Sequence, residues 1–120
     1  MIEKIEGLPG NIVGFEAVGT VNESDYKDVI IPTVDHAVKT FGNVRFLYII
    51  GDKYEGYSPM AMWDDAKIGL KHLGDWEKIA IVTNTEWISN AVDVFGKAFT
   101  GEVKTFSLAE KDTATKWIME

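Results

Sequence analysis

The amino-acid sequence predicts an α/β domain whose mostly parallel five-stranded sheet begins with an N-terminal antiparallel hairpin and has helices packed around it. Strand-like apolar runs alternate with segments of helical periodicity, in the order β-β-α-β-α-β-α-β-α, which is typical of parallel sheets. Two of the runs, VRFLYII and KIAIVT, are apolar on both faces, as in strands that are covered on both sides. The 120 residues suffice for one domain, 1–120, with one core.

The hairpin is predicted from the first eighteen residues. Residues 1–6 alternate around Ile2 and Ile5, as a short strand does. The sequence GLPG at 7–10 has turn chemistry, and residues 11–18 form a second apolar run. Two strands joined by a short turn are expected to pair antiparallel.

The first helix is expected to begin after Asn22 and to end before Gly42. Asn22 is a good N-cap, and Asp25 suits the positive end of the helix. Gly42 is a favoured residue just past a helix end. Pro32 lies inside the periodic segment and lacks the N–H that its position needs, so we expect a kink there.

The remaining elements follow along the chain. They are a strand at 44–50, a loop at 51–59, a helix from Pro59, a strand at 78–83, a helix at 85–99, a strand at 102–107, and a helix at 108–119 with Ala114, Trp117 and Ile118 on its inner face. In the helix from Pro59, Ser58 is the expected N-cap and Pro59 the first residue. Its core stripe comprises Trp63, Ala66, Leu70 and Leu73.

Catalytic motifs do not stand out. The sequence has no glycine-rich phosphate loop and no G-x-S-x-G elbow. His36 and His72 fall on different predicted helices, outside any metal-ligand spacing. Asp64 and Asp65 lie about two turns before His72, roughly 11 Å along the axis, too far for a direct hydrogen bond. We therefore predict a protein that is not an enzyme and that uses no cofactor and no metal.

Charge and composition restrict the partners. The formal net charge of −7 disfavours nucleic acids and anionic membranes. Cysteine is absent, which excludes disulfides and thiolate chemistry. No apolar run approaches the roughly 18–20 residues of a membrane span, and the N-terminus does not resemble a signal peptide. We expect a cytoplasmic protein without integral membrane association.

A binding surface is predicted where the chain leaves the two most apolar strands. Ligands of parallel sheets bind beyond the carboxyl ends of the strands, where the loop at 51–59 and the turn at 84–85 emerge. Met60 and Met62 add adaptable apolar surface there. The predicted ligand- or partner-binding residues are Tyr54, Tyr57, Met60, Met62, Trp63 and Trp87. The alternative is that these side chains pack the loop against the domain.

Three blocks of the sequence together resemble the SpoIIAA-like family of the STAS superfamily. They are VGTVNESDYKDVIIPTVDHAV, then VRFLYII with YEGYSPMAMWDDAKIGLKHLGDWEKIAIVTNTEWI, and the ending FSLAEKDTATKWI. The resemblance covers nearly the whole chain and depends on the order and spacing of the blocks. It implies a β-α fold that is related to CRAL-TRIO lipid-binding domains.

The resemblance also implies a function. It points to a STAS-like regulatory or binding domain that recognises a partner protein or a small apolar ligand, and a homodimer is expected. The alternative is binding of lipid or fatty acid in the CRAL-TRIO manner. Classical members are switched by phosphorylation of a serine at a helix N-terminus after the central strand, and Ser58 is nearest to that position here. The family's D-S-x-G pattern is absent, so N-capping is the simpler role of Ser58.

Overall fold

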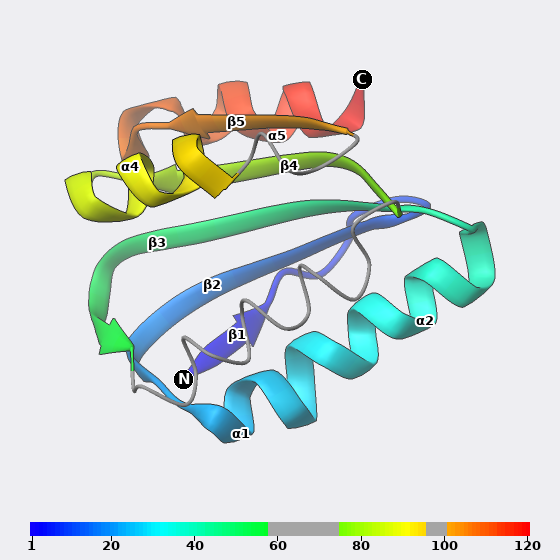
Figure 1. Cartoon of the computed structure of the whole chain (residues 1–120), viewed down its shortest axis with the longest axis horizontal. Coiled ribbons are helices and arrows are strands. Elements are labelled where there is room, and N and C mark those ends of the chain that lie inside the picture. Colours follow the sequence, from blue (N-terminus) through cyan, green and yellow to red (C-terminus); the bar gives the residue numbers. More distant parts are fainter. Residues whose placement is uncertain (58–74, 96–100) are drawn as a thin grey trace.

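The computed structural model describes residues 1–57, 75–95 and 101–120, except for the side chains of 52–57, 91, 94 and 95. These residues contain one five-stranded sheet whose strands lie in chain order, β1-β2-β3-β4-β5 (Figure 1). The strands are β1 (Ile2–Lys4), β2 (Ile12–Val21), β3 (Val44–Tyr57), β4 (Trp76–Thr83) and β5 (Glu102–Phe106). β1 pairs antiparallel with β2, and the other neighbours are parallel. The mixed sheet and its N-terminal hairpin are therefore confirmed.

The described helices follow the strands as predicted. They are α1 (Glu23–Asp25), the π-helix η1 (Tyr26–Ile30), α2 (Ile31–Phe41), α4 (Glu86–Phe95), the 3-10 helix η3 (Leu108–Glu110) and α5 (Lys111–Met119). Asn22 caps α1 through a capping box with Asp25, and Gly42 ends α2 at a φ of 84°, a left-handed conformation that favours glycine. The helix predicted from Pro59 lies outside the described residues.

The irregularity expected at Pro32 is a π-helical turn just before it. The N–H of Ile31 donates to the Tyr26 carbonyl, five residues back, so the chain widens before the proline arrives. Pro32 has no N–H of its own, and the next residue, Thr33, donates its hydroxyl to the Val29 carbonyl at 2.7 Å. The helix thus accommodates the missing N–H of Pro32 by changing from α-helical to π-helical hydrogen bonding over one turn.

Each face of the sheet carries its own core. The larger core includes Val13, Phe15, Phe46, Tyr48 and Ile81, and the helices before β3 and after β4 supply Tyr26, Ile30, Val34, Ala37 and Ile88. The smaller core lies under α5 and comprises Ile12, Leu47, Ile49, Ala80, Val82, Ala114 and Ile118. Ala114 and Ile118 are buried as predicted, and Trp117 packs against them partly exposed. α2 and α5 therefore lie on opposite faces of the sheet (Figure 1).

β3 is longer than predicted. The sequence predicts a strand at 44–50 and a loop at 51–59, whereas β3 continues to Tyr57. β2 has register irregularities on both sides of Gly19, whose φ is +65°, and there it bends. The end of β3 stays paired with β2 through this bend, with Tyr54 opposite Gly19 and Tyr57 opposite Val21 (Figure 1).

Candidate functional site

The carboxyl ends of β4 and β5 meet at one edge of the sheet. We call the segments 83–87 and 106–110, which follow these ends, the carboxyl rim. A side chain joins the two segments, because the backbone N–H of Leu108 donates to the side-chain oxygen of Asn84 at 3.0 Å. The buried Thr83 hydroxyl accepts the N–H of Thr85, also at 3.0 Å. The two connections are thus held to each other, although they are far apart in the sequence.

Trp87 is the large aromatic side chain that this rim exposes. It lies in the first turn of α4, and half of its surface (50%) is accessible to solvent. The next residue, Ile88, is only 6% exposed and anchors the same turn in the larger core. The backbone position of Trp87 is therefore fixed from within while its indole faces outward. Large exposed aromatics on a firm support are common centres of protein interfaces.

Phe41 is a useful comparison because it is equally exposed, at 52%, but lies elsewhere. It ends α2, and β3 begins three residues later at Val44, so Phe41 belongs to the amino edge of the parallel strands. Figure 1 places the end of α2 and α4 at opposite ends of the sheet. The two aromatic residues therefore differ in location and not in exposure.

A second capping box stabilises the rim after β5. The Glu110 carboxylate accepts the backbone N–H of Ser107 at 2.9 Å and its hydroxyl at 3.0 Å. These hydrogen bonds favour the ionised form and lower the pKa of Glu110 below its ordinary value. Glu110 is exposed, so it adds a permanent negative charge to the outer surface of the rim at neutral pH.

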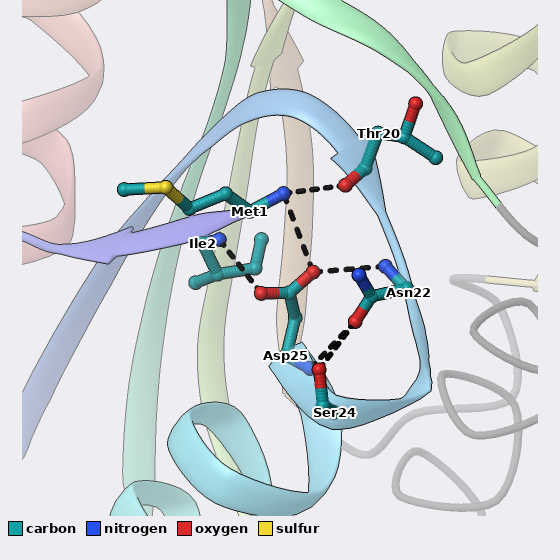
Figure 2. Close-up of polar contacts among 6 residues, drawn as sticks. All are labelled: Met1, Ile2, Thr20, Asn22, Ser24 and Asp25. Carbon is teal, nitrogen blue, oxygen red and sulfur yellow. Dashed lines mark hydrogen bonds and ion pairs between the residues drawn. The ribbon is translucent and has the colours of Figure 1, made fainter.

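The start of α1 is a separate polar cluster at the end of β2. Figure 2 shows the Asp25 carboxylate between three nitrogen atoms. It accepts the N–H of Ile2 at 3.1 Å and the N–H of Asn22 at 2.8 Å, and it pairs with the Met1 amino group at 3.3 Å. Met1 also donates to the Thr20 carbonyl. This cluster joins β1 to the helix start and has a structural role.

The predicted binding residues are only partly placed. Trp87 lies on the carboxyl edge, as the sequence predicts. Tyr54 and Tyr57 lie in the extension of β3 along β2 and not in a loop, and their side chains are outside the description. Ser58, Met60, Met62 and Trp63 lie outside the described residues. Their grouping with Trp87 stays a prediction.

The structure tests the catalytic alternatives only in part. His36 is exposed on α2. His72, Asp64 and Asp65 fall outside the described residues. Within residues 1–57, 75–95 and 101–120, no group of three or more His, Asp or Glu side chains is placed to hold a metal ion.

Sequence reasoning missed a basic cluster at the amino edge. Arg45 pairs with Glu77 through its Nε at 2.6 Å and donates to the Ile118 carbonyl at 2.9 Å. Lys78 donates to the Trp117 carbonyl at 3.0 Å and lies 4.9 Å from the centre of the Trp117 ring. These cations satisfy the last carbonyls of α5, a favourable arrangement at a helix C-terminus. The sequence signal for this cluster was one basic residue near the start of each apolar strand, Arg45 in VRFLYII and Lys78 in KIAIVT.

Comparisons with known proteins agree with this fold. A family model described as SpoIIAA-like matches residues 12–119. A crystal structure of an uncharacterised protein from Shewanella loihica PV-4, described as having a SpoIIAA-like fold, is similar with a TM-score of 0.76 and 28% sequence identity, covering 98% of this chain and 92% of that one. No curated protein matches significantly. Among the described helices, none is long and apolar enough to cross a membrane.

Proposed function

This chain belongs to the SpoIIAA-like family, and we propose that it is a non-enzymatic domain that recognises a partner protein at its carboxyl rim. The SpoIIAA-like fold is that of a regulatory or binding domain. The observation that carries the proposal is the half-exposed indole of Trp87 on a helix turn that Ile88 anchors in the core. The exposed half of the Trp87 side chain does not stabilise the fold by burial, so contact with a partner is the better explanation of its exposure.

The rim is suited to a protein partner because it is already ordered. Asn84 joins its two segments, and the Ser107–Glu110 box fixes the second one. Little conformational entropy remains to be lost there when a partner binds. The predicted residues Tyr54, Tyr57, Met60, Met62 and Trp63 would widen this surface, and phosphorylation of Ser58 would add a regulated charge to it.

Photo-crosslinking in the native host tests the proposal. A benzophenone amino acid replaces Trp87 in one variant and Phe41 in a matched control, because both side chains are half exposed. We expect a cross-linked product of defined mass from position 87 and none from position 41. Equal products from both positions, or none from position 87, would contradict recognition at the rim.

Native mass spectrometry of the purified wild-type protein separates the remaining alternatives. A species of twice the chain mass that is absent from the Trp87→Ala variant would identify a second copy of the chain as the rim partner. A retained fatty acid that is lost in the Trp87→Ala variant would favour apolar-ligand binding instead. A monomer without adduct, together with a specific cross-link at position 87, is the result that a separate protein partner predicts.

A further inference from the structure

We propose that the carboxyl rim docks an arginine-bearing segment of the partner protein, with the guanidinium stacked on the Trp87 indole and attracted by the exposed carboxylates of Glu86 and Glu110. This inference depends on the proposed function and specifies the chemistry of the partner. It follows from the combination of one exposed aromatic ring with the charges that surround it.

The two segments of the carboxyl rim carry negative charge and no positive charge. Residues 83–87 and 106–110 contain two carboxylates, Glu86 and Glu110, and no lysine or arginine. Both carboxylates are exposed, and the hydrogen bonds from Ser107 keep Glu110 ionised. α4 continues this charge, because it carries Asp93 in addition to Glu86 and has no basic residue.

The described elements next to the rim do not make its charge positive. At the start of α5, Lys111 is followed by Asp112, so these two charges cancel. After the carboxyl end of β2, Lys27 of η1 pairs with Glu23 of α1 at 2.6 Å. The basic groups Arg45 and Lys78 lie at the opposite edge, where they bind the end of α5. Among the residues that the structure describes, the charges around the rim are therefore net negative and attract an approaching cation.

Arginine fits this surface better than other groups. A guanidinium stacks on an indole and binds a carboxylate at the same time, whereas an ammonium is compact and strongly hydrated. An acidic peptide or an anionic lipid headgroup would be repelled by Glu86 and Glu110. A purely apolar segment would leave both carboxylates facing it without a partner. An exposed tryptophan can contact many kinds of partner, and charge complementarity favours a cationic segment among them.

Titration with defined peptides tests this inference on the wild-type chain. The probe is a tri-arginine peptide, with tri-lysine and tri-glutamate peptides as comparisons. The readout is the NMR signal of the Trp87 indole N–H, which the Trp87→Phe variant assigns. We expect the tri-arginine peptide to shift this signal, the tri-lysine peptide to bind more weakly, and the tri-glutamate peptide to leave it unchanged.

Three variants separate a docking site from diffuse attraction by the net charge of −7. Trp87→Ala is expected to weaken tri-arginine binding about fivefold and Glu86→Gln about threefold, and added salt is expected to weaken it further. Phe41→Ala is expected to leave it unchanged. Equal binding by wild type and Trp87→Ala, or an unmoved indole signal, would overturn the inference.

The cross-linking experiment shows which proposal fails. A specific product at position 87 with no preference for arginine would overturn only the cationic segment. Absence of that product would refute the partner site itself. An indole signal that shifts with protein concentration alone would show a second copy on this face and would overturn the arginine-bearing partner.

Discussion

Gly101→Ala is expected to be among the most destabilising single-methyl changes in the chain. Gly101 precedes β5, and a Cβ built there lies 2.2 Å from the Trp76 carbonyl oxygen, 2.5 Å from the Glu77 carbonyl oxygen and 2.7 Å from the Glu77 carbonyl carbon. All three are backbone atoms of β4, so no side chain can turn away. The change has to push β5 from its neighbour.

The magnitude follows from the kind of contact. Adding a methyl group to a packed interior costs typically ~1–3 kcal/mol, and the rigid backbone neighbours of Gly101 place it near the upper end, about 3 kcal/mol. In open space, replacing glycine by alanine at an ordinary φ would stabilise by ~0.4–1 kcal/mol. The sign therefore depends entirely on the clash with Trp76 and Glu77. For a chain of this size the expected fall in melting temperature is roughly 12 °C.

Urea unfolding followed by tryptophan fluorescence measures this loss. The control is Gly10→Ala, because Gly10 has a φ of +61° and no atom within 4 Å of the added Cβ. That variant pays only for the left-handed backbone, about 1 kcal/mol. A loss below about 1 kcal/mol for Gly101→Ala, or a loss no larger than that of the control, would refute the steric argument.

Three further predictions follow from single residues. Trp87→Ala should cost only about 1 kcal/mol of unfolding free energy, because half of the side chain is exposed. Trp76→Ala should cost ~3–5 kcal/mol, because that side chain is 5% exposed and its ring packs edge-on against Phe46. Urea unfolding compares the two variants, and similar losses would contradict the surface role of Trp87. Asp25→Ala should cost about 2 kcal/mol, since it removes a capping box and leaves the N–H of Ile2 without its acceptor. Thermal unfolding compares this variant with Asp28→Ala, which changes an exposed carboxylate of the same segment. Equal effects of the two variants would contradict the structural role of the Asp25 cluster. Folding lowers the pKa of Glu110, so the contribution of this carboxylate to stability is complete above its ordinary pKa and is lost as the pH falls through the lowered pKa. The difference in melting temperature between wild type and Glu110→Gln should therefore narrow on acidification. A difference that stays constant from neutral pH down to about pH 3 would contradict this.

The sequence predicts the elements whose signals are local. Asn22 and Asp25 lie three residues apart, and their capping box forms as the residue types indicate. Gly42 ends its helix for a similarly local reason. The apolar run 44–50 identifies the central strand because burial on both faces leaves no polar alternation.

The features that sequence reasoning missed depend on distant partners. Residues 51–57 have the polar and glycine content of a loop, yet they continue β3 because β2 bends at Gly19 and offers its backbone beside them. The strand predicted at 78–83 begins two residues earlier, at Trp76, whose ring packs on Phe46 inside the core. The link between Asn84 and Leu108 spans 24 residues and could not be predicted from either loop. Of the candidate site, the sequence predicted only the position of Trp87, because the end of a strand can be predicted from the sequence whereas the contacts around it cannot.

The agreement between the order of the strands in the sheet and their order in the chain has a consequence for synthesis on the ribosome. A chain that emerges from its N-terminus can close the β1–β2 hairpin first and fasten it to α1 through Asp25. Each later strand then joins the free margin of the part already formed, and no strand has to be inserted between two others. Folding during translation can thus proceed by successive additions, each stabilised by the strand before it. The last addition is β5, which completes the surface where Trp87 is exposed.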